Sequence, residues 1–194
     1  MKSMIPDDPI IEIPYVAIDT ETTGLDSTGG DRILEIAALR FHRGNVIDSF
    51  VTLLNPGVPV SHGAFRVHGI SNDMLLDAPA FGDIFSDLVA FIGEDPTVYH
   101  NAHFDLKFLR MEAMFIHKRW VNNVVIDTLR LARTVKGRFR GNSLGSLAKE
   151  YETGLPGHRA MSDAHATGKI LLELAYREGE HMTLSELIGV SGIR

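Results

Sequence analysis

One stretch, residues 15–25 (YVAIDTETTGL), constrains the fold of this chain most. Its β-branched, apolar start follows a proline and predicts a buried strand. Asp19 and Glu21 close that strand, and residues two apart on a strand point to the same side. Two converging carboxylates are costly unless a cation neutralises them, and their hard oxygens suit Mg²⁺ or Mn²⁺. The stretch therefore predicts a metal site at a strand end; the alternative is a surface turn with two solvated acids.

Length and composition indicate a single globular domain over residues 1–194, with 1–12 as a loose N-terminal lead-in and 180–194 as a short C-terminal tail. No apolar run approaches the roughly 20 residues that span a bilayer, and the N-terminus lacks a signal-peptide pattern. There is no cysteine, which excludes disulfides and thiolate metal sites. We therefore expect a cytoplasmic protein without a membrane partner.

The net charge of −6 argues against a protein that passively coats a polyanion. An enzyme acting on nucleic acid stays compatible with this charge, because metal ions can neutralise an acidic site and basic residues can be local.

Strand and helix patterns alternate along the chain and predict an α/β fold with a sheet of mixed direction. After the first strand, the apolar runs 33–41 and 46–54 flank a short turn, so three strands should form an antiparallel meander. Glu35 falls inside the second of these strands and receives no role. Further strands are predicted at 97–100 and 124–126, and helices at 79–92, 104–114, 128–134, 143–151 and 160–177.

A second polar group, residues 100–105 (HNAHFD), lies where the predicted fourth strand passes into a helix. Ligands bind at such strand ends in open α/β sheets. Asp105 in the first helical turn also has a simpler explanation, a favourable interaction with the helix dipole. Asn101 has one as well, as a turn or capping residue.

A third polar group, residues 158–165 (HRAMSDAH), spans a loop and the start of the last long helix. The five-residue step from His158 to Asp163 can bring both side chains to one opening. The alternative is a helix-start acid beside a surface histidine. His165 is turned away from Asp163 on a helix and is interpreted as structural.

In this order, the three groups resemble the signature of the DEDDh 3′–5′ exonuclease family. The resemblance is closest to proofreading exonucleases similar to the epsilon subunit of bacterial DNA polymerase III. It spans roughly residues 14–175. The matching segments are 19–25 (DTETTGL), 67–70 (VHGI), 100–105 (HNAHFD), 126–129 (IDTL) and 158–164 (HRAMSDA).

The resemblance implies a ribonuclease-H-like fold, a five-stranded mixed sheet flanked by α-helices. It assigns metal binding to Asp19, Glu21, Asp105 and Asp163, and the general base to His158. Four carboxylates suit two divalent ions, Mg²⁺ or Mn²⁺. A histidine with a reference pKa of about 6.5 can accept a proton from water near neutral pH. The implied reaction is stepwise hydrolysis of single-stranded DNA from its 3′ end to nucleoside 5′-monophosphates, in proofreading or repair.

Five further positions match residues that surround the terminal nucleotide in the family: Thr22, Val67, His68, Asn101 and Phe104. An apolar or aromatic side chain there can stack on any base, so we expect weak sequence preference.

Two functional alternatives stay open. Small RNA exonucleases share the five catalytic residues, so RNA trimming is the second interpretation, although residues 20–24 and 67–70 favour the DNA branch. A catalytically silent nucleic-acid-binding module is disfavoured, because it would need none of those five residues.

The sequence contains no glutamine and therefore lacks the glutamine-based clamp-binding motif of the polymerase subunit. A stand-alone enzyme, an excised domain and a subunit with a DNA polymerase partner are all compatible with this absence.

A local basic cluster stands out in this acidic chain, with no acid between residues 128 and 141. An aromatic residue, Phe139, sits between two arginines in what the sequence predicts as a loop. The hypothesis is that the cluster follows the phosphates of the entering strand, with Phe139 as a stacking platform; the alternative is a solvated basic loop. Its basic members are Arg130, Arg133, Lys136, Arg138 and Arg140.

Overall fold

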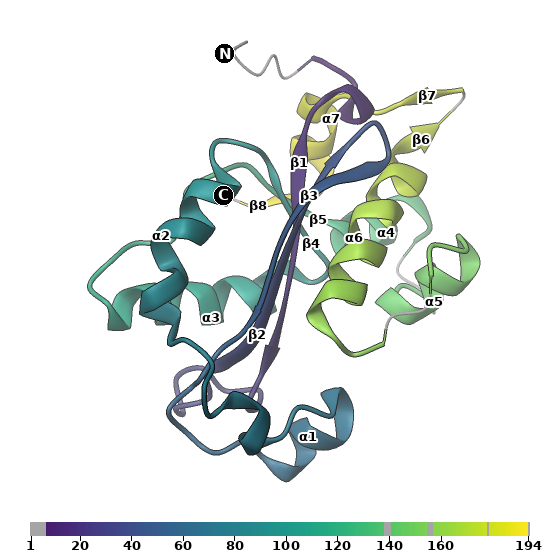
Figure 1. The fold of residues 1–194 in the computed structure, drawn as a ribbon. Coiled ribbons are helices and arrows are strands. Elements are labelled where there is room, and N and C mark those ends of the chain that lie inside the picture. The colour runs from purple at the N-terminus through teal and green to yellow at the C-terminus, as the bar shows by residue number, and fades with distance from the viewer. Residues whose placement is uncertain (1–6, 138–140, 155–156, 178, 194) are drawn as a thin grey trace.

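A mixed β-sheet runs through the centre of the fold (Figure 1). The computed structural model describes residues 7–137, 141–154, 157–177 and 179–193. The strand order is β3-β2-β1-β4-β5-β8. The strands are β1 (Tyr15–Thr22), β2 (Ile33–His42), β3 (Asn45–Leu53), β4 (Thr97–Tyr99), β5 (Val125–Asp127) and β8 (Gly192–Ile193). The predicted five-stranded mixed sheet is confirmed, and the two-residue strand β8 extends its edge.

The first three strands form the predicted antiparallel meander, and β4 and β5 continue the sheet in parallel with β1. Strand β1 is buried on both sides. Because alternate residues face opposite sides, Val16 and Ile18 pack in one core, while Tyr15 and Ala17 pack in the other. Asp19 continues the second series, so it points toward the same face of the sheet as Tyr15.

Helices cover both faces of the sheet (Figure 1). Helices α2 and α3 lie on one face, α4, α5 and α6 lie on the other, and α1 lies beyond the carboxyl end of β1. The helices are α1 (His62–His68), α2 (Phe81–Ile92), α3 (Ala102–Phe115), α4 (Thr128–Val135), α5 (Leu144–Glu150), α6 (Ala160–Ala175) and α7 (Leu184–Ser191). Two 3-10 helices, η1 (Ile10–Glu12) and η2 (Asn72–Leu75), and a small hairpin of β6 (Tyr176–Arg177) and β7 (Glu180–His181) complete the elements. Among the described residues, no helix is both long and apolar enough to cross a membrane.

Helix α6 packs unusually close to the sheet at Gly168. The Tyr15 hydroxyl donates a hydrogen bond to the carbonyl oxygen of Gly168 (2.9 Å), and the Tyr15 and Phe41 rings stack with centroids 5.3 Å apart. A Cβ atom at Gly168 would lie 2.3 Å from the Phe41 ring. Only glycine permits this approach, which fixes the start of α6 over the carboxyl end of β1.

Both chain ends differ from the sequence expectation. Ile10, in the expected lead-in, is fully buried, and its N–H donates to the carbonyl of Met182 (3.0 Å). The expected tail contains α7, whose Leu184 and Leu187 are buried in the core beside α6. These segments are too short to show a clear periodicity, and their order comes from packing against distant elements.

Candidate active site

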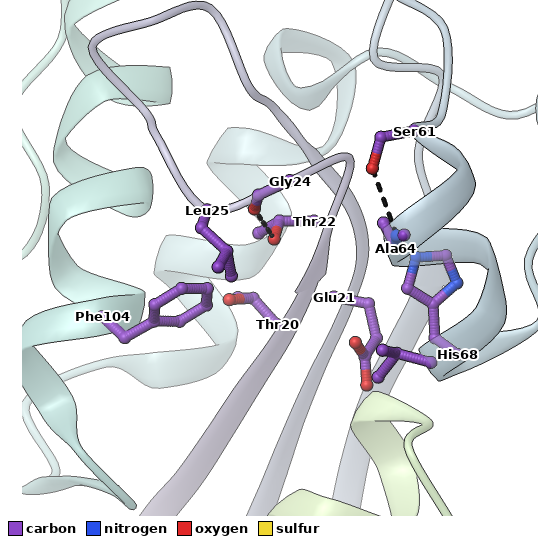
Figure 2. Close-up of a pocket in the computed structure, with 11 residues that line it drawn as sticks. Thr20, Glu21, Thr22, Gly24, Leu25, Ser61, Ala64, His68 and Phe104 are labelled. Atoms are coloured by element: carbon purple, nitrogen blue, oxygen red, sulfur yellow. Dashed lines mark hydrogen bonds between the residues drawn. The ribbon is translucent and has the colours of Figure 1, made fainter.

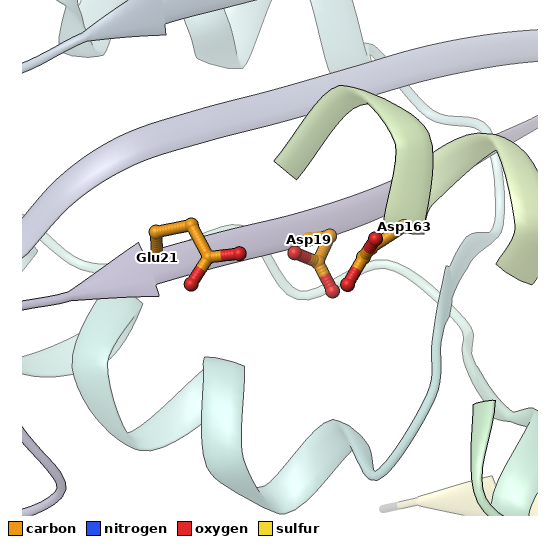
Figure 3. A group of neighbouring side chains, drawn as sticks. All are labelled: Asp19, Glu21 and Asp163. Atoms are coloured by element: carbon orange, nitrogen blue, oxygen red, sulfur yellow. The ribbon is translucent and has the colours of Figure 1, made fainter. Parts of the chain in front are cut away.

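Three carboxylates meet above the carboxyl half of β1 (Figure 3). Asp19 and Glu21 come from alternate positions of β1, and Asp163 comes from the first turn of α6. One carboxylate oxygen from each residue lies within 4.8 Å of the other two. The structure therefore brings together three of the four predicted metal ligands.

Crowding and burial make this cluster unfavourable without a cation. Burial, followed by the charges of Asp105 and Asp163, raises the pKa of Asp19 well above its ordinary value. Burial and the charge of Asp163 raise the pKa of Glu21 to about 8. Burial also raises the pKa of Asp163. A site of carboxylate oxygens that resist ionisation next to one another fits a hard divalent cation.

Asp105, the fourth predicted ligand, lies beside the cluster but is held differently. It is 3% exposed on α3, and its Oδ1 accepts hydrogen bonds from the backbone N–H (3.1 Å) and the hydroxyl (2.8 Å) of Thr20. Burial raises its pKa to about 7, and its charge in turn raises the pKa of Asp19. Asp105 therefore approaches β1 from the α3 side, while Asp163 approaches from the α6 side.

His158 occupies the exposed loop just before α6. Its φ of 50° lies in the left-handed region, which non-glycine residues rarely adopt. Its charge and its backbone N–H both lower the pKa of Asp163, so the two residues are close neighbours. Next to it, the Gly157 N–H contacts Oδ1 of Asp163 (3.2 Å). The predicted pairing of His158 with Asp163 at one opening agrees with this arrangement.

A cavity of about 550 Å³ adjoins the acid cluster and shares Glu21 with it (Figure 2). Four of the five predicted nucleotide contacts line it: Thr22, Val67, His68 and Phe104. The other lining residues are Thr20, Glu21, Gly24, Leu25, Ser61, Gly63 and Ala64. The cavity thus lies between the end of β1, helix α1 and the start of α3.

Two of these side chains are fixed by local hydrogen bonds. The Thr22 hydroxyl donates to the carbonyl of Gly24 (2.6 Å). Nδ1 of the buried His68 accepts from the Ile70 N–H (3.0 Å), and burial lowers the pKa of His68. With Nδ1 as the acceptor, the ring proton lies on Nε2.

Asn101, the fifth predicted contact, is not among the lining residues of this cavity. It is exposed at the N-cap of α3 with a left-handed φ of 69°, and its N–H donates to Oδ1 of Asp127 (3.1 Å). These observations agree with the turn interpretation and leave a nucleotide contact as a prediction.

Leu25 and, in helix α1, Gly63 and Ala64 line the cavity beside the predicted Val67 and His68, and were not themselves predicted as contacts. The Leu25 side chain is 77% exposed, and its carbonyl accepts a hydrogen bond from Nζ of Lys107 (2.6 Å). The same ammonium lies 4.8 Å from the centroid of the Phe104 ring, so Lys107 links two walls of the cavity. The available signal for α1 was Ser61, which caps the helix by accepting from the Ala64 N–H (3.1 Å).

The basic cluster is only partly described. Lys136 forms an ion pair with Glu150 and lies 5.5 Å from the centroid of the Tyr151 ring. Its charge is thus already partnered within the protein. The other proposed strand-binding residues, Arg138, Phe139 and Arg140, lie outside the described residues.

Comparisons with known sequences identify the family of this chain. A family model described as Exonuclease matches residues 16–171. A DNA polymerase III subunit epsilon-like protein of Rhodobacter capsulatus is 38% identical over 178 residues, which cover 89% of this chain and 25% of that protein. A PolC-type DNA polymerase III of Bacillus subtilis is 37% identical over 187 residues, which cover 93% of this chain and 13% of that protein. The chain therefore spans a quarter or less of the length of these relatives.

Solved structures give the same result. Exonuclease X in complex with 5′ overhanging duplex DNA superposes with a TM-score of 0.71 at 26% identity, covering 89% of this chain and 98% of that one. The nuclease domain of 3′hExo, a DEDDh family member bound to rAMP, superposes with a TM-score of 0.77 at 14% identity, covering 91% and 98%. The second likeness concerns the fold alone.

A ribonuclease-H-like sheet with acids on β1 and at the start of α6 defines a 3′–5′ exonuclease domain. The chain belongs to the exonuclease family that the family model describes, and its resemblance to the DEDDh type is confirmed.

Proposed function

We propose that this chain removes nucleoside 5′-monophosphates one at a time from the 3′ end of single-stranded DNA, in proofreading or repair. The observation that carries the proposal is the cluster of Asp19, Glu21 and Asp163, with ligand oxygens within 4.8 Å, opening onto a cavity of about 550 Å³. DNA is favoured over RNA because the curated relatives carry DNA polymerase names and the neighbour at 26% identity is bound to DNA.

The cofactors in this proposal are two divalent ions, Mg²⁺ or Mn²⁺. Asp19, Glu21 and Asp163 would hold them, and Asp105 would complete the set from the α3 side. When bound, such ions act as Lewis acids that stabilise charge on the phosphate and on the departing 3′ oxygen. The protein contributes a fixed set of carboxylates, since β1 is buried between two strands.

His158 is the proposed general base. Its exposed position gives it access to water, and a positioned imidazole can accept a proton from that water. After His158 takes the proton from the attacking water, the neighbouring Asp163 stabilises the imidazolium. His158 has a left-handed backbone in a loop that the Gly157 N–H ties to Asp163 at the start of α6.

The cavity is the proposed site of the 3′-terminal nucleotide. Phe104 and Val67 offer faces on which any base can stack, so base preference should be weak. Thr22 and His68 supply polar atoms for the sugar and phosphate, and Asn101 is a further proposed contact at the start of α3. A DNA polymerase is the proposed partner, supported by the names of the relatives.

The test uses 5′-labelled single-stranded DNA and RNA of equal length with Mg²⁺ or Mn²⁺. We expect a ladder that shortens from the 3′ end on DNA, and none with Asp163→Ala. A ladder on RNA alone would favour the exoribonuclease alternative. No cleavage of either strand would favour the nucleic-acid-binding module.

A further inference from the structure

A further acidic side chain, Glu35, lies next to the cluster without belonging to it. Glu35 on β2 is the cross-strand partner of Glu21 on β1, so the two side chains point to the same face of the sheet. It is only 2% exposed. A buried acid beside three others would be unfavourable unless a specific partner held it.

That partner is Arg159, the residue that immediately precedes α6. Its Nε lies 3.1 and 3.0 Å from the two carboxylate oxygens of Glu35, and its Nη2 lies 2.6 Å from Oε1. Oε2 also accepts a hydrogen bond from the backbone N–H of Ala160 (2.9 Å). Both oxygens of Glu35 are thus occupied by the start of α6, and Glu35 is not among the residues whose oxygens could share an ion.

This contact joins the two halves of the proposed site. Strand β2 is paired with β1, which carries Asp19 and Glu21, and the start of α6 carries Asp163. Arg159 also follows His158 directly. The ion pair therefore links the strand that supplies two ligands to the helix and loop that supply the third ligand and the base.

We propose that Arg159 and Glu35 are positioning residues, which hold the side chains of His158 and Asp163 at a fixed position relative to the acids on β1. This inference rests on the proposed function. A bidentate guanidinium–carboxylate contact defines orientation as well as distance, which a lysine cannot reproduce. Stability is a weaker explanation, because the Arg159 side chain is 46% exposed and ion pairs that solvent can reach contribute little to stability.

The experiment compares Arg159→Met, Arg159→Lys and the double variant Arg159→Met/Glu35→Gln with the wild type. Arg43→Met is the matched control, since Arg43 makes a similar contact with Glu12 at an exposed position. The readouts are kcat and KM on a short oligonucleotide, the Kd of Mn²⁺ from calorimetry, and the melting temperature.

Arg159→Met alone leaves Glu35 buried without its counter-charge, so we expect this variant to have a lower melting temperature than the wild type. The double variant removes that charge and should recover most of the melting temperature. Its kcat should nevertheless stay lower, and its Kd for Mn²⁺ higher, by roughly 10- to 100-fold, the usual effect of losing a residue that orients metal ligands. KM should change little, since no substrate contact is removed.

Arg159→Lys retains the positive charge but cannot make the bidentate contact. Its kcat and its Kd for Mn²⁺ should therefore both lie between those of the wild type and the double variant. It supplies the same comparison if the Met variants do not fold. A folded variant, double or lysine, with kcat and Kd both within about twofold of the wild type would overturn the positioning role. If the wild type cleaves no nucleic acid, the proposed function fails, and the Mn²⁺ titrations alone decide this inference.

Discussion

Glu21 should destabilise the metal-free protein as the pH rises. Burial and the charge of Asp163 raise its pKa from an ordinary value of 4.5 to about 8. Each pKa unit corresponds to about 1.4 kcal/mol, so ionising Glu21 in the folded protein costs about 5 kcal/mol relative to the unfolded chain. Part of this energy is shared with Asp19 and Asp163, so replacing Glu21 alone with glutamine should recover about 3 kcal/mol at high pH.

The sign follows from proton binding. Below pH 4.5, Glu21 is protonated in both the folded and the unfolded chain, and its contribution to stability is fully present. Between that value and about 8, the folded state binds more protons, so the free energy of unfolding falls as the pH rises. Glu21→Gln stays neutral throughout. Comparing it with the wild type at each pH cancels the titrating groups that lie away from the acid cluster, while the shared energy of Asp19 and Asp163 remains in the difference.

The assay is thermal unfolding of both proteins with a chelator, between about pH 4.5 and 8.5. For a domain of this size, 1 kcal/mol shifts the melting temperature by about 2–4 °C, so Glu21→Gln should melt about 6–12 °C higher than the wild type at the upper pH. Saturating Mg²⁺ should reduce or reverse this difference, because the ion binds the intact acid set better. The exposed Glu94→Gln serves as control. Equal melting of Glu21→Gln and the wild type at high pH would refute the reasoning.

Three further outcomes are expected. Asp19→Ala and Asp163→Ala should each nearly abolish cleavage while leaving folding intact or improved; a variant that keeps about a tenth of the turnover in Mg²⁺ would contradict the metal-site assignment. His158→Ala should lower kcat roughly 10²- to 10⁴-fold and remove the acidic limb of the pH–rate profile, and persistence of that limb would point to another base. Gly168→Ala should lower the free energy of unfolding by about 1–3 kcal/mol, because the clash with Phe41 outweighs a gain in helix propensity of up to about 1 kcal/mol. An unchanged midpoint of denaturant unfolding would contradict the close packing of α6.

The parts of the fold that depend on local patterns could be predicted from the sequence. The second strand was expected at 33–41 and is observed at Ile33–His42. The side shared by Asp19 and Glu21 follows from the two-residue period of a strand. The position of Asp163 in the first turn of α6 follows in the same way from the helical pattern after residue 160.

Features that depend on distant contacts could not be predicted in this way. Helix α1 is short, and its role as a cavity wall depends on where the chain brings it relative to β1. The same holds for α7, whose apolar side chains are significant only once they pack in the core beside α6. Glu35 had no assigned role for this reason, because its partner Arg159 is 124 residues away.

The packing of α6 explains how the protein keeps mutually repelling acids together. At its start, the helix is tied to β2 by the contact of Arg159 with Glu35. One residue past its midpoint, Gly168 brings the helix against Tyr15 and Phe41 so closely that no side chain fits between them. With two points fixed, α6 can neither slide nor tilt away from β1 when Asp163 is repelled. Burial, together with repulsion between the acids, therefore raises the pKa values of Asp19 and Glu21 while the carboxylates stay in place for a divalent cation.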